Sequence, residues 1–306
     1  MKNSSLFVFF LFLLCSCNER STNFIEVETE NPFSFFSITE FQDTLYATSG
    51  MVWENGLLSI SADGIEWTHD SLTNKAIFDI ETLNDQLIAV GVDGYIFTGK
   101  PDLKFTRTDK WDILRAVTSY SNDYIAVGGK DLNKGWIYEI KEDLSNVEVT
   151  QFPFQLMDIK CSDEGNCIAA GFGNILLRNN DQSNWQRLEI EGDFYTSIDI
   201  NENGDFVVIG TNGSILLIDE DSFTINTINK PSSAFGRSIG FRNIRFFDNR
   251  GFIVGDNGNV WKSDNHGLSW EDISLDTNTN LADMTLKDDT LIIVGERGRI
   301  INYPIN

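Results

Sequence analysis

The sequence has few of the residues that mark several common functional classes. It carries 23 Lys and Arg against 46 Asp and Glu, and this net charge of −23 disfavours nucleic acid and anionic lipid headgroups as partners. Four cysteines and two histidines, His69 and His266, are too few and too scattered for a standard zinc site. We therefore predict no metal centre, no cofactor and no nucleic-acid partner.

Long hydrophobic runs are absent after the N-terminus. Leu6–Leu14 is apolar and follows one positive charge at Lys2, which is typical of a secretory signal and too short to cross a bilayer as a helix. The run ends in Leu-Cys-Ser-Cys, which resembles a bacterial lipobox. This resemblance implies a signal peptide over 1–16, acylation of Cys17 and a lipid-anchored tether over 17–23. The alternative is an ordinary secretion signal.

Two cysteines remain beyond this leader. Cys161 and Cys167 flank Ser-Asp-Glu-Gly-Asn, a polar turn between two apolar runs. Exported proteins meet oxidising conditions, so we predict a cross-strand disulfide between these two residues. The alternative is a pair of free, half-buried thiols.

The chain is rich in repetition. An apolar run closed by glycine, such as LIAVG (87–91) or FIVG (252–255), recurs along the sequence. The closing glycines are Gly50, Gly91, Gly128, Gly171, Gly210, Gly255 and Gly295, at spacings of 41, 37, 43, 39, 45 and 40 residues. A period near 40 with seven members indicates a repeat architecture.

Each repeat contains the pattern of four short strands. An alternating segment such as AIFDIETL (76–83) precedes the apolar run, and a glycine turn, a third strand and a weaker fourth segment follow. No useful length has a helical period. The sequence thus predicts an all-β, seven-bladed β-propeller of four-stranded antiparallel blades over 24–306. The seventh repeat stops after its third strand, and we expect the orphan strand at 24–29 to complete it.

A turn motif lies between the third and fourth strands of the sixth repeat. Its pattern, Ser-x-Asn-x-Gly-x-Ser-Trp, resembles the Asp-box of sialidases and of many non-catalytic propellers. Asn, Asp and Ser accept hydrogen bonds from turn amides, Gly allows a positive φ and Trp covers the blade, so we assign the motif a structural role. Its residues are Ser263, Asn265, Gly267 and Trp270, with a shorter copy at Ser61, Asp63, Gly64 and Trp67.

With its first strand, its glycine hairpin and this turn, the sixth repeat resembles the photosystem II stability/assembly-factor-like propellers, within the BNR group. The resemblance covers 33–306 as architecture and is close only in the sixth repeat. It implies a ring that binds or helps to assemble other proteins. Sialidase chemistry needs an arginine triad that begins in an early Arg-Ile-Pro-like motif, whereas only Arg20 lies in the first hundred residues here.

Arginines cluster at one place in this acidic chain. Arg242 and Arg245 lie on the predicted first strand of the sixth repeat, and Arg115 holds the position of Arg242 in the third. First strands line a propeller channel, so Arg115, Arg237, Arg242 and Arg245 are candidates to bind a carboxylate or an acidic peptide. The alternative is internal ion pairing. Three aspartates share the adjacent position and could also bind a cation: Asp79, Asp158 and Asp283.

These observations predict a non-catalytic binding or assembly platform for a cell-envelope protein. We expect the chain to be exported and anchored through its lipid at the bacterial outer membrane, facing either the periplasm or the exterior. The alternative is a glycan-binding lipoprotein or a carbohydrate-active hydrolase that uses the propeller face. A deep pocket with facing carboxylates and stacked aromatics would favour the glycan; a shallow face with Arg242 and Arg245 exposed would favour a protein.

Overall fold

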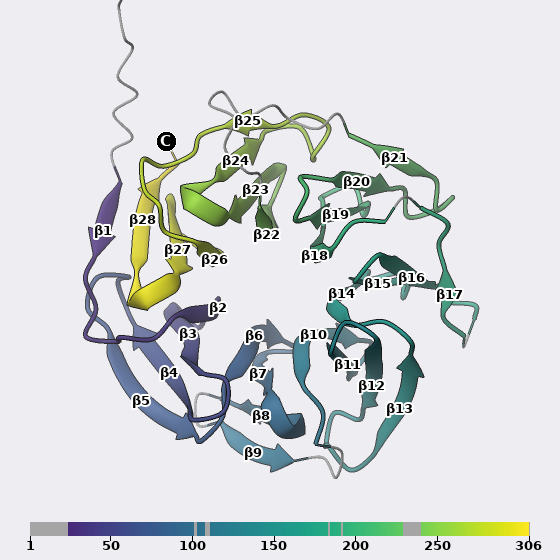
Figure 1. Cartoon of the computed structure of the whole chain (residues 1–306), viewed down its shortest axis with the longest axis horizontal. Helices are drawn as coiled ribbons and strands as arrows, with labels where there is room; N and C mark the ends of the chain where they lie inside the picture. Colours follow the sequence, from purple (N-terminus) through teal and green to yellow (C-terminus); the bar gives the residue numbers. More distant parts are fainter. Residues whose placement is uncertain are drawn as a thin grey trace, which may run out of the picture.

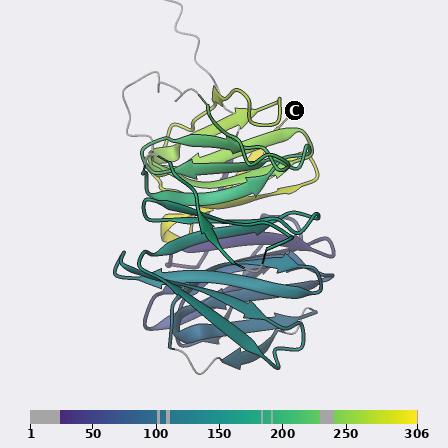
Figure 2. The same cartoon turned by 90° about the vertical axis from the view of Figure 1, so that its right-hand side faces the viewer.

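The computed structural model describes residues 24–100, 103–107, 111–182, 184–190, 192–228 and 240–305. They form seven four-stranded antiparallel sheets around a central channel, which confirms the predicted propeller (Figure 1). Seen from the side, the strands run between the two ends of the ring (Figure 2). The predicted signal peptide, Cys17 and the tether lie outside the described residues. None of the described helices is long and apolar enough to cross a membrane.

From the channel outward, each of the first six blades uses four consecutive strands. Blade 1 contains β2 (Phe35–Phe41), β3 (Thr44–Met51), β4 (Asn55–Ser61) and β5 (Thr68–Thr73). Blade 2 contains β6 (Ile77–Leu83), β7 (Gln86–Gly91), β8 (Tyr95–Gly99) and β9 (Lys104–Arg107). Blade 3 contains β10 (Leu114–Tyr120), β11 (Asp123–Lys130), β12 (Lys134–Ile140) and β13 (Val147–Phe152).

The second half of the ring repeats this order. Blade 4 contains β14 (Leu156–Cys161), β15 (Cys167–Gly171), β16 (Asn174–Arg178) and β17 (Gln186–Arg187). Blade 5 contains β18 (Tyr195–Ile200), β19 (Phe206–Gly210), β20 (Ile215–Ile218) and β21 (Ile225–Thr227). Blade 6 contains β22 (Phe241–Phe247), β23 (Arg250–Gly255), β24 (Val260–Ser263) and β25 (Glu271–Asp272). Short 3-10 segments join second to third strands at η1 (Val92–Gly94), η2 (Asp256–Gly258) and η3 (Glu296–Gly298).

Blade 7 joins the two ends of the chain. It contains β26 (Leu281–Lys287), β27 (Thr290–Gly295) and β28 (Ile300–Pro304), and its outer strand is β1 (Ile25–Val27). β1 pairs antiparallel with β28, so that Ile25 lies opposite Asn302. The N-terminal strand therefore completes the last blade, as the sequence predicts, and pairs the edge that β28 would otherwise expose.

The hydrophobic core lies between blades, which explains the fully apolar second strands. One cluster joins Ile88 and Val90 of blade 2 to Val117, Tyr124 and Tyr138 of blade 3. Second strands are therefore buried on both faces and lose the alternation of a half-exposed strand. Burying each large apolar side chain contributes roughly 1.5–3 kcal/mol, so the interfaces between blades dominate the stability of the ring.

The glycine that closes each apolar run sits where two backbones approach closely. A Cβ on Gly128 would lie 1.8 Å from the carbonyl oxygen of Ile113, just before the first strand of the same blade. Gly91, Gly171 and Gly255 have the same contact, at 2.1–2.3 Å from a backbone oxygen. The period of about 40 residues thus records a position where no side chain fits.

In blade 4, Cys161 and Cys167 lie directly opposite each other across β14 and β15. The structure joins them by a disulfide, with 4.0 Å between their Cα atoms. The bond closes the hairpin whose turn is the polar segment between the two cysteines.

Candidate functional site at the channel mouth

A cavity of about 540 Å³ opens at one end of the central channel. The first strands of all seven blades contribute to it. In each of them the pairing with the second strand shifts register after the first residue, as at a β-bulge. A bulge re-aims side chains and often borders a functional site. The second residues of the first strands line the cavity: Phe36, Phe78, Arg115, Met157, Thr196, Arg242 and Ala282. We call this end of the ring the pocket end.

One wall of the pocket is aromatic. Phe36 and Phe78 meet edge to face, with 5.1 Å between their ring centroids, and the guanidinium of Arg115 lies 5.2 Å from the ring centroid of Phe78. With the amide oxygen of Gln155 turned toward it, Arg115 donates from Nε at 2.9 Å and from Nη2 at 3.2 Å. Burial lowers the pKa of Arg115. Among the described residues, no carboxylate lies within ion-pair distance of this guanidinium.

Arg242, three blades away, is the most open of the charged groups at the mouth, with 40% of its side chain exposed. Its Nε lies 2.5 Å from Oδ1 of Asp256 and its Nη2 lies 3.8 Å from Oε1 of Glu296. These two carboxylates balance its charge. The internal pairing that the sequence left open is therefore present at this arginine.

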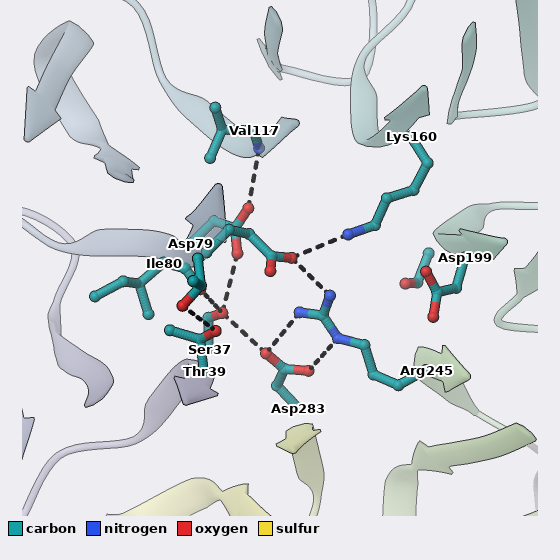
Figure 3. Close-up of polar contacts among 12 residues, drawn as sticks. Ser37, Thr39, Asp79, Ile80, Val117, Lys160, Asp199, Arg245 and Asp283 are labelled. Atoms are coloured by element: carbon teal, nitrogen blue, oxygen red, sulfur yellow. Dashed lines mark hydrogen bonds and ion pairs between the residues drawn. The ribbon is translucent and has the colours of Figure 1, made fainter. Parts of the chain in front are cut away.

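Arg245 points into the channel below the mouth and is only 14% exposed (Figure 3). Its Nη1 lies 2.6 Å from Oε1 of Glu81, and its Nη2 lies 3.3 Å from Oδ2 of Asp283. Lys160 also reaches Glu81, at 3.0 Å. Burial opposes ionisation of Glu81, but the attraction of the two cations outweighs the effect of burial and lowers the pKa of Glu81 to about 2. Arg245 thus forms internal ion pairs and is not an exposed anchor. Arg237 lies outside the described residues.

The three aspartates of the matching first-strand position connect neighbouring blades. Oδ2 of Asp283 accepts the backbone N–H of Ile38 at 2.9 Å, and Oδ2 of Asp79 accepts that of Val117 at 2.9 Å. In the same way, Oδ2 of Asp158 accepts the N–H of Ile198 at 2.7 Å. Each carboxylate therefore holds the first strand of the next blade. The repeated spacing of these residues was the sequence signal for this role, which was not predicted.

The channel floor has more carboxyl groups than cationic side chains. Five carboxylates (Asp79, Glu81, Asp158, Asp199 and Asp283) stand against two cations, Lys160 and Arg245. Burial raises the pKa of Asp158 and of Asp199. Within the part of the chain that the structure describes, no group of three or more metal-ligating side chains is arranged to hold a metal ion. The cation site considered from the sequence therefore has no structural support.

Ser37 indicates where one proton resides in this network. Its Oγ lies 2.9 Å from Oδ1 of Asp79 and 2.9 Å from Oδ2 of Asp283 (Figure 3). A hydroxyl has one proton to donate, so both contacts are hydrogen bonds only when one carboxyl group is protonated. Burial and the neighbouring Glu81 raise the pKa of Asp79 to about 7. Asp283 contacts Arg245, so the proton belongs on Asp79.

Large apolar side chains are exposed at the pocket end of the ring. Of the eight such side chains among the described residues, five lie at the pocket end, in or beside loops that join second to third strands or that lead into a first strand. They are Met51, Trp53, Trp111, Leu132 and Phe172. Trp111 is 69% exposed and Trp53 is 55% exposed. They were not predicted from the sequence, although bulky apolar residues within polar loops were a usable signal.

The turn motifs of blades 1 and 6 lie at the opposite end of the ring. In blade 6, Oγ of Ser263 accepts the N–H of Gly267 at 3.0 Å, and Oδ1 of Asn265 accepts that of Ser269 at 3.0 Å. Trp270 donates from Nε1 to the carbonyl oxygen of Gly267 at 3.0 Å. These contacts satisfy the turn from within, as a structural motif requires.

The shorter copy in blade 1 forms the same pattern. Oγ of Ser61 accepts the N–H of Gly64 at 2.9 Å, and Oδ1 of Asp63 accepts the N–H groups of Ile65 and Glu66, both at 2.9 Å. These backbone hydrogen bonds lower the pKa of Asp63. Trp67 packs against Phe35, with 6.4 Å between ring centroids.

Comparison with known proteins yields structural matches alone. No family model matches the chain, and no curated protein matches its sequence. A structure of YCF48, a photosystem II assembly factor, bound to a D1 peptide superposes with a TM-score of 0.71 at 15% identity, over 92% of this chain and 97% of that one. The WD40 β-propeller domain of Doa1 superposes with a TM-score of 0.70 at 13% identity, over 92% of this chain and 96% of that one.

An enzyme is similar in fold as well. It is a catalytically inactive histidine-to-alanine variant of virginiamycin B lyase from Staphylococcus aureus, in a structure with quinupristin. The TM-score is 0.75 at 11% identity, over 92% of this chain and 100% of that one. At these identities the likeness shows a shared fold and nothing finer.

Proposed function

We propose that this chain is a non-catalytic platform that holds another polypeptide against the pocket end of the ring. The observation that carries the proposal is that the cavity and five of the eight exposed large apolar side chains share one end. Single exposed apolar residues are ordinary, but a group around a concave site is typical of an interaction surface. Loops on a rigid scaffold commonly carry binding.

The structural relatives support a polypeptide ligand by analogy. YCF48 holds a D1 peptide on the same fold, which shows that such a ring can present a peptide-binding surface. Because only the fold is shared, the choice of surface here depends on the residues of this chain.

The proposal includes a lipid anchor at Cys17 and an outer-membrane location. In β1, Val27 lies opposite Ile300, which follows η3 at the pocket end, and Ile25 lies opposite Asn302, farther from it. The chain therefore enters the ring at the end opposite the pocket. A seven-residue tether over 17–23 reaches at most about 25 Å. Anchored there, the ring would turn its pocket end away from the membrane. Cys17→Ser should release the protein from the membrane fraction.

A second candidate is a glycan ligand or a hydrolase site. The pocket has the carboxylates and the aromatic wall that favour this alternative, and Asp79 has a pKa of about 7. However, Asp79 and Asp158 are each engaged by the N–H of a neighbouring blade. Neither histidine lines the pocket. His69 forms a hydrogen bond with Ser59 on the outer side of blade 1, and His266 lies in the turn of blade 6. Binding on a glycan array that Phe36→Ala abolishes would favour this candidate.

The test is capture of partners from intact cells after cross-linking, using a tagged full-length chain. A Trp53→Ser/Trp111→Ser variant alters the pocket end, and Ile65→Ser/Leu268→Ser removes as many exposed apolar groups from the opposite end. We expect one envelope protein to be captured by the native chain and by the second variant, and lost with the first. Equal capture by all three would contradict the assignment of the binding end. Arg245→Glu is unsuitable, because it adds a third carboxylate beside Glu81 and Asp283.

A further inference from the structure

We infer that the pocket at the channel mouth receives a positively charged side chain, a lysine or an arginine, from the bound polypeptide. The inference rests on the proposed function and names the class of residue that the pocket recognises. It replaces the acidic peptide expected from the arginine pattern, because the charges of Arg242 and Arg245 are balanced inside the molecule.

The pocket has negative charge to offer. Six carboxyl groups and four cationic side chains are among the described residues that line it, and with the proton on Asp79 five carboxylates remain against the four cations. Arg242, Arg245 and Lys160 are all paired with carboxylates, whereas Asp158 has no Lys or Arg of the described chain within ion-pair distance. An anionic group that entered the channel would approach this excess of carboxylates. A cation would reduce it.

Asp158 is placed to contact such a cation. Its side chain is partly open to the pocket, whereas Asp79 and Asp283 are buried. Oδ2 accepts from the N–H of Ile198 at 2.7 Å and from Oγ of Ser197 at 2.8 Å, and Oδ1 accepts from the N–H of Ile159 at 2.7 Å. An ionised carboxylate can accept about four hydrogen bonds. One acceptor site on Oδ1 therefore remains for an ammonium or a guanidinium.

The walls of the pocket suit the rest of a long basic side chain. Phe36, Phe78, Met157 and Phe194 line the approach to the floor. Lysine and arginine bury their methylene stems against apolar surface and keep the charged group in a polar setting. Aromatic rings add a favourable contact for a cation. Arg115 is the one lining cation without a carboxylate partner among the described residues, and its guanidinium lies against the ring of Phe78 and donates to Gln155.

The experiment measures binding of the full-length chain to peptide pools that differ in one fixed central residue, with random residues around it. The central residues are Lys, Arg, Glu, Asp, Gln and Leu. We expect the Lys and Arg pools to bind at least about tenfold more tightly than the Gln pool. Asp158→Asn should remove most of this preference, because the amide oxygen can still accept the N–H of Ile198 but carries no charge. Asp264→Asn, on the exposed opposite end, should leave it intact.

A second variant keeps the test decisive if Asp158→Asn does not fold. Met157→Lys places a tethered ammonium in the pocket wall, and it should compete with Lys and Arg pools and abolish their advantage. The inference is overturned if Glu or Asp pools bind best, or if the central residue has no effect. Failure of the platform itself looks different: no pool would then bind the native chain better than Trp53→Ser/Trp111→Ser.

Discussion

The turn of blade 6 and the floor of the channel are both held by polar side chains that bind backbone amides, but their contacts differ in reach. In the turn, Ser263 and Asn265 bind partners at most four positions away. In the channel, Asp283 binds Ile38 across 245 positions, and Arg245 reaches Glu81 across 164. Local contacts shape one corner, whereas the distant ones hold the ring closed.

The two regions should therefore differ in what they contribute to stability. The turn contacts are partly exposed to water, where a hydrogen bond contributes about 1 kcal/mol. In the channel, losing one partner leaves a buried charge without its counterpart, which costs about 3–5 kcal/mol. Three substitutions test this contrast.

Asp283→Ala should have the largest effect. Asp283 is 1% exposed, and its loss removes the acceptor for Ile38 and a partner of Arg245 where blade 7 meets blade 1. We expect the free energy of unfolding to fall by about 3–5 kcal/mol in urea titrations. Asp264→Ala, a surface control, should change it by less than about 0.5 kcal/mol. Equal effects of the two variants would show that the channel contacts contribute no more to the free energy of unfolding than a surface side chain does.

Asp79→Asn should change how stability depends on pH. The folded-state pKa of Asp79 is about 7 against an ordinary 3.8, so its contribution is fully present below pH 4 and is lost as the pH rises through 7. Glu81, whose pKa is about 2, contributes stability above about pH 4.5 that is lost only as the pH falls toward 2. The native chain should therefore lose stability between pH 5 and pH 8.

Asp79→Asn should reduce that loss, by on the order of 2 kcal/mol. Some loss should remain, because burial also raises the pKa of Asp158 and Asp199. The substitution leaves in place the other charged groups that influence the pKa of Asp79, which are Lys160, Arg245, Glu81 and Asp158. Urea titrations at the two pH values measure the difference. A variant with the same loss as the native chain would place the proton elsewhere.

Asn265→Ala should have the smallest effect, about 1 kcal/mol, because it removes the acceptor for the N–H of Ser269 at an exposed turn. Thermal unfolding of this variant and of Asp283→Ala, measured side by side, ranks the contributions of the turn and of the channel to stability. A loss at Asn265 as large as that at Asp283 would erase the distinction between corner and channel.

The same contrast explains what could be predicted from the sequence. The fold was predictable, because the glycine at each close approach, such as Gly128, repeats at a readable period. The turn at Ser263 was also predictable, since all its partners are local. The disulfide needed only a short hairpin between Cys161 and Cys167, and the structure places a bond there.

The channel chemistry could not be predicted in this way. Glu81 of blade 2 meets Arg245 of blade 6 only because the ring brings their strands together, and no pattern along the chain records that pairing. Grouping Arg242 with Arg245 by sequence hid their difference, since the former lies at the mouth and the latter lies below it with only 14% of its side chain exposed. Trp53 and Trp111 come to lie at the same end of the ring as the pocket for the same geometric reason.

The most direct test of the binding end is site-specific photo-cross-linking in intact cells. A photoreactive phenylalanine would replace Trp111 at the pocket end in one variant and Leu268 at the opposite end in another. The account predicts a discrete cross-linked protein with the probe at position 111 and none at position 268. A cross-link at position 268 with none at 111 would contradict the central claim that this propeller binds its partner through the pocket end.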